Sequence, residues 1–179
     1  MPLARLLVLL TLLCAALLGP AAGAATPAPP PPSSPAPSGV WGWPFPGAPE
    51  VSRAFDPPPT PYAAGHRGVD LLGGVGAPVL SSGDGVVAFA GMVAGRPVVS
   101  VEHAGGLRTT YEPVEPSVAA GQAVARGSPL GTLAAGHAGC PAEACLHWGL
   151  RHGGLRHGEV YLDPLSLLQP PRISLLPWS

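Results

Sequence analysis

An all-β fold, an antiparallel β-sandwich, is predicted for most of this 179-residue chain by two observations. The first is a series of short runs rich in Val, Thr, Tyr and Leu, with Gly, Pro or Asp in each gap, which is typical of strands separated by turns. The second is that no run after the first 25 residues has helical periodicity over a useful length. We expect strands at residues 85–90, 97–102, 107–111, 146–151 and 159–162.

Glycine-rich turns support the same fold. The run Ala104-Gly105-Gly106 stands between two expected strands and is a good hairpin signal. Residues 118–131 have Val and Gly at regular spacing, which suits tight bends in a small sandwich or barrel. This spacing is also typical of lipoyl and biotinyl carrier domains, but those attach their cofactor to a lysine and this chain contains none. A carrier function is therefore excluded.

Residues 1–25 are predicted to be a secretory signal peptide. Arg5 supplies a positive start, residues 6–18 are apolar, and residues 22–24 form a small-x-small cleavage site. The apolar run has 13 residues, whereas a stable transmembrane helix needs about 20. We expect cleavage and no stable membrane span afterwards, with a retained anchor as the alternative.

The rest of the chain divides into a linker, one domain and a tail. Residues 26–40 are rich in Pro, Ala and Ser, with seven prolines in residues 26–39, and are expected to form an extended, semi-rigid spacer. A single domain follows at residues 41–168, which is long enough for one modest core, and residues 169–179 form a C-terminal tail. We expect a monomer that is secreted or associated with the cell wall.

Charge excludes one class of partner. The formal net charge is −1, all nine basic residues are arginine, and the arginines form no cluster in the sequence. A nucleic-acid partner is therefore not expected.

Two cysteines, Cys140 and Cys145, remain after the signal peptide, which contains Cys14. In an oxidising compartment, cysteines this close together are most simply a disulfide that closes a short loop. A pair of free buried thiols is the alternative.

Three residues of metal-ligating type, His66, Asp70 and His147, form the candidate site. Two imidazoles and one carboxylate suit Zn²⁺ and leave a fourth tetrahedral position open. Such a zinc can generate hydroxide near neutral pH and polarise an amide carbonyl. On a straight strand His66 and Asp70 would lie about 13 Å apart, but Gly68 between them permits a bend. His147 must come from a distant strand, so the site is expected to be assembled across the sheet.

The segments around these residues follow one another in a characteristic order: GHRGVDL (65–71), GAPV (76–79), DGVV (84–87), GLRTTY (106–111), GSPLG (127–131) and LHWGLR (146–151). In this order they resemble the lysostaphin-like (LytM-type) zinc metallopeptidase family, over residues 41–168. The resemblance implies a duplicated-hybrid-motif fold, which is an antiparallel β-sandwich with a zinc groove. It also implies peptidoglycan peptide cross-links as the substrate, and His66, Asp70 and His147 as the ligands of Zn²⁺.

Two other histidines of that family are replaced in this chain. Pro113 and Cys145 stand at their positions, where the family's histidines orient the attacking water and stabilise the tetrahedral oxyanion. The expected function is a secreted zinc metalloendopeptidase, a peptidoglycan hydrolase, with a relocated catalytic helper. The alternative is a catalytically degenerate domain that binds cell wall or regulates another wall hydrolase.

Three residues are candidates for the helper. His137, in the loop before the strand of His147, is the first. Glu143 lies between the cysteines, and Glu112 precedes Pro113, although strand alternation points it to the opposite face. General acid–base help of this kind is worth roughly 10²–10⁴ in rate. Cys145 as a fourth zinc ligand, which would close the site, is a further alternative.

The remaining aromatic and imidazole side chains receive plainer interpretations. Three histidines are expected to be exposed polar residues: His103, His152 and His157. Trp148 alternates with His147 and is expected in the core. Trp41 and Trp43 either line a groove or fix the start of the domain.

Overall fold

The computed structural model describes residues 41–60, 62–153 and 160–169. The predicted signal peptide at 1–25, the predicted linker at 26–40, residues 170–179 of the predicted tail and His157 lie outside the described residues. Within the described ranges no helix has the length and apolar character needed to cross a membrane.

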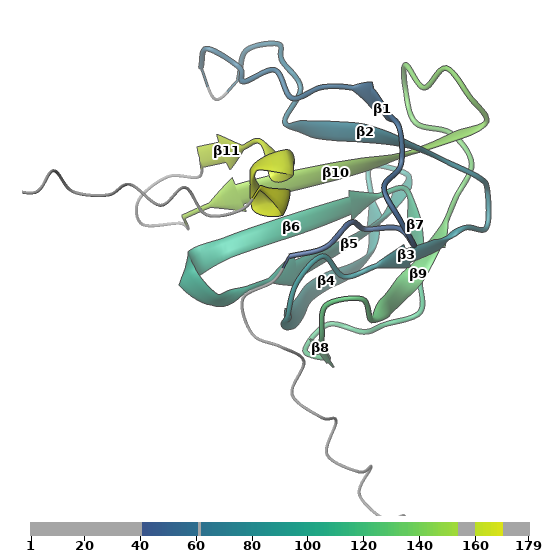
Figure 1. Ribbon diagram of the computed structural model, residues 1–179, viewed down its shortest axis with the longest axis vertical. Coiled ribbons are helices and arrows are strands. Elements are labelled where there is room, and N and C mark those ends of the chain that lie inside the picture. Colours follow the sequence, from purple (N-terminus) through teal and green to yellow (C-terminus); the bar gives the residue numbers. More distant parts are fainter. Residues whose placement is uncertain (1–40, 61, 154–159, 170–179) are drawn as a thin grey trace, which may run out of the picture. The chain divides into compact units, whose positions relative to one another are not determined.

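The described chain folds into antiparallel strands joined by turns (Figure 1). The strands are β1 (Val51–Arg53), β2 (Gly68–Gly73), β3 (Pro78–Leu80), β4 (Gly85–Val93), β5 (Arg96–Glu102), β6 (Leu107–Glu112), β7 (Val114–Pro116), β8 (Ala123–Val124), β9 (Pro129–Leu133), β10 (Ala144–His152) and β11 (Val160–Leu162). Two short 3₁₀ helices are η1 (Ala104–Gly106) and η2 (Pro164–Leu168).

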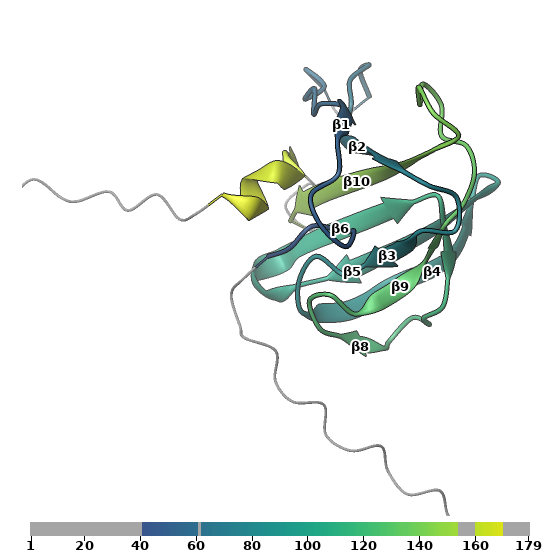
Figure 2. The same ribbon diagram turned by 45° about the vertical axis from the view of Figure 1, so that its right-hand side comes forward.

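Two sheets make up the domain. The larger has the order β1-β2-β10-β6-β5-β4-β8, with β11 paired to β10, and the smaller has the order β3-β9-β7. Figure 2 shows β3 and β9 lying over the strands of the larger sheet. The predicted antiparallel β-sandwich is therefore confirmed.

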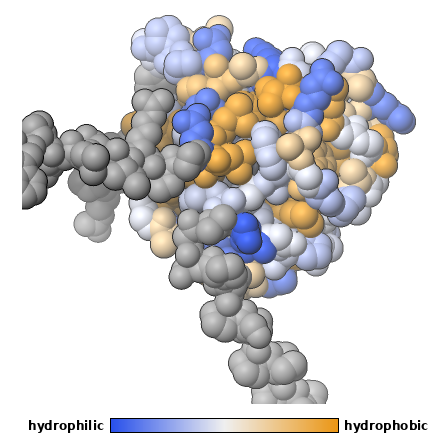
Figure 3. Space-filling model, viewed as in Figure 1, coloured by the Kyte–Doolittle hydropathy of each residue, from blue (hydrophilic) through white to orange (hydrophobic). Residues whose placement is uncertain are grey.

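The core lies between the two sheets and includes side chains from both. Its largest members are fully buried: Trp148, Tyr111, Leu71, Leu130, Leu133 and Leu146. On the surface seen in Figure 3, apolar residues gather near the middle of the face and polar residues occupy much of its edge. Burial of the large side chains is the main term that stabilises such a sandwich, at about 25 cal/mol per Å² of apolar surface.

The five strands expected from the sequence are β4, β5, β6, β10 and β11, and all five are confirmed. The Ala104-Gly105-Gly106 turn joins β5 to β6 as expected, with positive φ at both glycines. Strand β2 was not expected, because its sequence GVDLLG has two glycines and a buried aspartate. It forms because β1 and β10 flank it on both sides.

The aromatic residues at the start of the domain fix its first segment to the core. The Trp43 and Trp148 ring centroids are 6.3 Å apart, and Trp148 is fully buried as expected. The ring centroids of Trp41 and His103 are 4.8 Å apart, and the two ring planes are close to perpendicular. Of the two roles open to these tryptophans, this packing supports the structural one.

The expectation that His103 is exposed is wrong, because its side chain is 6% exposed. Its Nδ1 lies 2.8 Å from the Asp84 carbonyl oxygen, and its Nε2 lies 2.7 Å from Thr109 Oγ1. Thr109 Oγ1 is in turn 2.9 Å from the hydroxyl of Tyr111. Burial lowers the pKa of His103 and raises that of Tyr111. The chain of hydrogen bonds makes a buried polar network that the sequence pattern did not reveal. The expected exposure of His152 is confirmed.

Candidate metal centre

Asp70 and His147 reach one point because their strands are neighbours. Asp70 on β2 and His147 on β10 are directly opposed partners in the antiparallel ladder. The Nδ1 atom of His147 lies 2.9 Å from Oδ1 of Asp70. Asp70 and His147 are 77 positions apart in the sequence. The pairing of β2 with β10 is sufficient to bring their side chains together.

His66 is held just before β2 by its own backbone. Its N–H donates to the Asp56 carbonyl at 2.7 Å, and its carbonyl accepts from the Asp56 N–H at 3.0 Å. The Nδ1 atom lies 2.7 Å from the Ala54 carbonyl oxygen and must donate its hydrogen there. Its Nε2 lone pair is then available on the other side, 2.9 Å from Asp70 Oδ1 and 3.1 Å from His147 Nδ1.

Gly68 has no side chain, and this leaves space for the His147 ring between β2 and β10. A Cβ at this position would lie 2.4 Å from the Trp148 carbonyl oxygen and 2.8 Å from the His147 ring. The backbone of Gly68 does not have a positive φ, so the bend for which the glycine was expected is not the reason for it. The glycine is needed because β2 and β10 approach closely where the His147 ring lies.

The fourth member of the cluster is His137, the first of the three expected helpers. Its Nε2 lies 3.1 Å from Asp70 Oδ1, and its side chain is 13% exposed. The potential ligand atoms of His66, Asp70, His137 and His147 all lie within 4.8 Å of one another. The sequence predicted that His137 lies in a loop, but it did not predict the position of that loop relative to the metal-ligand candidates.

The loop that holds His137 is shaped by its backbone and by a disulfide. His137 has a φ of +100°, which L residues rarely adopt, and Gly136 before it also has a positive φ. A disulfide joins Cys140 to Cys145, with Cα atoms 5.7 Å apart. Cys145 is thus bonded to Cys140, which excludes it as a thiolate ligand or base in this form. A backbone conformation of this kind persists where the surrounding structure holds the residue in place.

The other two helper candidates lie elsewhere. Glu143 is exposed in the disulfide loop. Glu112 is opposite His147 in the β6–β10 ladder and shares a groove with it, but its Oε1 is paired at 2.5 Å with Nε of Arg96. Neither belongs to the cluster of four.

Electrostatics keep the central carboxylate ionised. Burial by itself raises the pKa of Asp70, which is 1% exposed, but hydrogen bonds from His137 and His147 and the charges of His137 and His66 outweigh it. The net effect holds the pKa of Asp70 well below its usual range. Asp70 is therefore an anion at neutral pH, which is the form that ligates metals.

The donor set fits a zinc ion. Ligand atoms placed tetrahedrally about 2.0–2.1 Å from Zn²⁺ are about 3.3 Å apart. The three contacts among His66, Asp70 and His147 measure 2.9, 2.9 and 3.1 Å. The Nδ1–H bond of His66 to a carbonyl is the kind of outer contact that orients a histidine ligand. Asp70 Oδ2 is buried without a hydrogen-bond partner among the described residues, so this oxygen also has an unused lone pair with which a cation could be bound.

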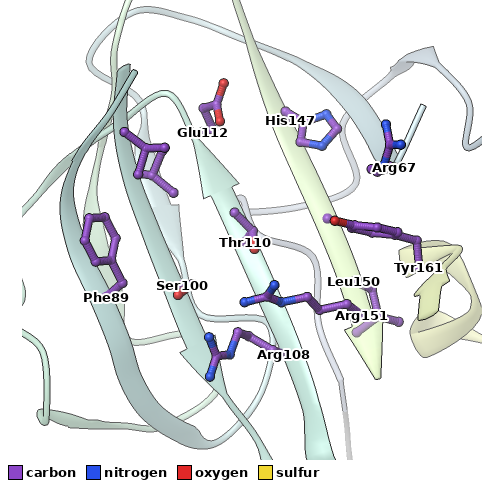
Figure 4. A pocket seen from close by; sticks show the side chains of 13 residues that line it. Arg67, Phe89, Ser100, Arg108, Thr110, Glu112, His147, Leu150, Arg151 and Tyr161 are labelled. Carbon is purple, nitrogen blue, oxygen red and sulfur yellow. The ribbon is translucent and has the colours of Figure 1, made fainter. Parts of the chain in front are cut away.

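A groove of about 490 Å³ opens beside His147 (Figure 4). Strand β10 contributes His147, Gly149 and Arg151 to its wall, and β6 contributes Arg108, Thr110 and Glu112. In Figure 4, Phe89 on β4 lies at the left of the groove and Tyr161 on β11 lies at the right. The cluster therefore adjoins this groove on the larger sheet through His147.

Parts of this site had no readable signal in the sequence. The Ala54 carbonyl that orients His66 is a backbone atom, so no residue type marks it. Apart from Leu150, the groove residues on β6 and β10 lie at every second position, which strand alternation could have revealed. Only the pairing of β6 with β10 places the two rows together.

Comparison with protein families gives a match at this site. The family model described as Peptidase family M23 matches residues 64–164. The uncharacterized protein Rv2891 of Mycobacterium tuberculosis is 52% identical over 138 residues, which cover 77% of this chain and 55% of the relative. The uncharacterized protein Mb2915 of Mycobacterium bovis matches with the same values. This chain thus spans about half the length of the curated relatives it matches.

Solved structures share the fold. Csd3 of Helicobacter pylori has a TM-score of 0.58 at 22% identity, over 77% of this chain and 37% of its own. The catalytic domain of the antimicrobial peptidase lysostaphin from Staphylococcus simulans has a TM-score of 0.56 at 21% identity, over 67% of this chain and 92% of its own. A zinc-containing peptidase from Vibrio cholerae has a TM-score of 0.51 at 29% identity, over 62% of this chain and 36% of its own.

Proposed function

Because the chain belongs to peptidase family M23, we propose that it is a zinc metalloendopeptidase that cleaves peptide cross-links of peptidoglycan. It acts outside the cytoplasm, as a secreted or cell-wall-associated protein. Support for the substrate comes from the lysostaphin catalytic domain, a peptidase described as antimicrobial, which has the same fold.

The proposed metal ligands are His66 Nε2, Asp70 Oδ1 and His147 Nδ1. Bound there, Zn²⁺ would supply a Lewis acid and a water of lowered pKa. The chain's own contribution is to fix the three donors. The register of β2 against β10 sets Asp70 and His147, and the Ala54 carbonyl holds the His66 ring in one tautomer.

His137 is the proposed proton-handling group, and its position is the observation on which the proposal rests. The resemblance to the family places Pro113 and Cys145 where two further histidines are expected, yet an imidazole, that of His137, stands at the cluster with Nε2 3.1 Å from Asp70 Oδ1. An imidazole near neutral pH can accept a proton from a water and return it to a leaving amine. The disulfide and the neighbouring glycines hold this side chain in place.

A second candidate function is a degenerate domain that binds the wall or regulates another hydrolase. The observation that favours this function is the contact between His137 and Oδ1 of Asp70. The two proposed histidine ligands, His66 and His147, contact the same oxygen. If His137 is itself a fourth ligand, the site is closed like a structural zinc site and has no open position for water.

One variant separates the two functions. His137→Ala removes the imidazole but none of the three proposed ligands. For the enzyme we expect zinc content and folding to be retained while hydrolysis of purified peptidoglycan falls at least about tenfold, or about 1.4 kcal/mol in transition-state stabilisation. His152→Ala removes an exposed histidine outside the cluster and is the matched control.

The outcomes are distinct. Unchanged hydrolysis in His137→Ala would show that His137 is not the proton-handling group, and Glu112 and Glu143 would be the next candidates. A wild type that is loaded with zinc but cleaves none of several wall chemotypes supports the degenerate domain, and so does loss of zinc from His137→Ala.

A further inference from the structure

Strand β4 leaves one edge of the larger sheet open over most of its length. Strand β8 pairs with β4 only at Gly85 and Val86. Backbone hydrogen bonds with residues 121–122 extend that contact to Val87. Beyond this point, residues 88–93 of β4 have a partner strand only on the β5 side within the described part of the chain. Residues 88–93 therefore form an open edge, which is a template for pairing with another strand.

The hairpin at the end of β4 fixes which backbone groups face the open edge. The two-residue turn Ala94-Gly95, with φ values of +49° and +82°, joins β4 to β5. A turn of this kind is closed by a hydrogen-bonded pair, which here is Val93 with Arg96. Such pairs alternate along an antiparallel ladder, so Met92 and Ala90 do not use their N–H and C=O groups toward β5. These groups point to the open edge.

The side chains of the open edge are apolar and partly in contact with water. Phe89 is 39% exposed, Met92 is 62% exposed and Val93 is 46% exposed. Residues 85–95 contain neither a charged residue nor a proline, and these are the residues that commonly protect an edge strand from pairing. The irregularity in the β4–β5 register lies before Phe89. The open edge therefore lacks a charge that would repel a second apolar strand.

The open edge is complementary to itself. In an antiparallel pair with Gly91 opposite the partner's Gly91, Ala90 lies opposite the partner's Met92 and can exchange two hydrogen bonds with it. Phe89 then lies opposite the partner's Val93, and both residues belong to the face that lines the groove. An aromatic side chain opposite a β-branched one is a favourable cross-strand pair. A twofold axis repeats each of these contacts, as in an isologous dimer.

We infer that the protein forms a twofold symmetric dimer in which the open edges of two copies pair as antiparallel strands. The larger sheet then continues from one copy into the other. Phe89 and Val93 stand at the end of the groove that is formed by β4 (Figure 4), and the same residues of the partner extend that apolar wall. A second copy is the occupant because the register matches the edge to itself. This dimer replaces the monomer that was expected from the sequence.

The dimer directs both metal centres to the same side. The twofold axis of an antiparallel pair is perpendicular to the sheet, so the grooves of the two copies open on one face. His147 lies three strands from β4, in the order β10-β6-β5-β4. Seven strand spacings thus separate the two copies of His147, about 34 Å at about 4.8 Å per strand. Under the proposed function two centres can act on one cross-linked surface, but the dimer itself does not depend on that function.

Sedimentation equilibrium of the zinc-loaded full chain tests the dimer. Pairing through so short an edge buries less than the about 800 Å² per partner of a standard interface, so we expect a Kd of about 1–100 µM. Met92→Lys should raise the Kd at least about tenfold, because the two lysines would occupy diagonal positions on the paired strands and repel each other. Met92 does not line the groove. Val75→Lys, which changes an exposed valine between β2 and β3, is the matched control and should keep the dimer.

A cysteine cross-link tests the register of the two strands. In the proposed pairing the Cα atoms of the two copies of residue 91 are about 4.5 Å apart, which a disulfide can span. The two copies of residue 93 are offset by about four residues, or about 13 Å, which a disulfide cannot span. Mild oxidation should therefore link Gly91→Cys into a covalent dimer but not Val93→Cys. A Cβ at residue 91 meets only the Phe89 ring, at 3.3 Å or more, so this variant is expected to fold.

The outcomes are decisive for the dimer alone. A monomer at every concentration up to about 500 µM, well above the expected Kd, overturns the inference. An unchanged Kd in Met92→Lys overturns it as well, and so does cross-linking of both cysteine variants or of neither. A dimer that is weakened by Met92→Lys and is cross-linked only through residue 91 supports the inference, whether or not the wild type hydrolyses peptidoglycan.

Discussion

His147 and Asp70 stand directly opposite each other on β10 and β2, with Nδ1 of the imidazole 2.9 Å from Oδ1 of the carboxylate. The geometry of the candidate site is thus a property of strand register. A slip by one residue would send one of the two side chains to the other face of the sheet.

Zinc binding is expected to depend on the histidine ligands. The purified protein should contain about one zinc per chain, and His66→Ala or His147→Ala should abolish it, because two protein ligands hold zinc poorly. Metal content by inductively coupled plasma mass spectrometry checks this, with His152→Ala as the control. Stoichiometric zinc in both ligand variants would mean that the ion binds elsewhere.

Gly68→Ala should damage the site without changing any ligand. The added Cβ would lie within 2.8 Å of the His147 ring and 2.4 Å of the Trp148 carbonyl oxygen, so β2 and β10 must separate or the ring must move. We expect zinc affinity to fall at least about tenfold and stability to fall by about 1–3 kcal/mol, as for other overpacked sites.

Gly74→Ala is the matched control for that variant, because a Cβ there meets nothing within 4 Å. Competition with a chromophoric chelator gives the zinc affinity, and chemical denaturation gives the stability. Equal zinc affinity in the two alanine variants would contradict the close-approach explanation.

The disulfide between Cys140 and Cys145 is expected to fix the His137 loop rather than the whole domain. Intact mass with and without reductant should differ by about two daltons, one hydrogen per sulfur. The double variant Cys140→Ser with Cys145→Ser should lose about 2 kcal/mol of stability, the loop-entropy value for so short a ring.

Hydrolysis should fall further in that double variant than its stability explains, because His137 is no longer held at the cluster. Assays are made well below the melting temperature of the variant, so that unfolding does not contribute. Wild-type activity in the double variant would show that the loop keeps its position without the bridge.

Stability should fall at mildly acidic pH because of His103. Its pKa is lowered in the folded state by burial, so between that value and the ordinary pKa of about 6.5 the unfolded chain binds more protons. The contribution of His103 to the free energy of unfolding is therefore complete above about pH 6.5. This contribution is lost as the pH falls below about 6.5.

Denaturation curves between pH 5 and pH 8 for the wild type and His103→Gln measure this effect. The variant should be less stable at pH 7, where it loses the contacts with Asp84 and Thr109, but its stability should depend less on pH. Parallel pH profiles for the two proteins would exclude His103 as the cause.

The fold class and three members of the cluster, His66, Asp70 and His147, could be predicted from the sequence alone. Alternation of β-rich runs with turn residues predicted β4, β5, β6, β10 and β11, because these strands have enough β-branched and aromatic residues to be read locally. The ligand types and their surrounding segments indicated His66, Asp70 and His147 before any strand was paired. Trp148 was placed in the core by its alternation with His147 alone.

How those residues meet depends on strand pairing, which became apparent only in the folded structure. The φ of His137, its contact with Asp70 and the space beside Gly68 all depend on which strands pair and on how closely they approach. The exposure of His103 was predicted wrongly for the same reason, since its burial follows from packing against Trp41 and Thr109. The local sequence pattern shows which residues of a strand alternate between its two faces. The position of a side chain in space depends on which distant strands pair, and the spacing of residues along the sequence does not contain that information.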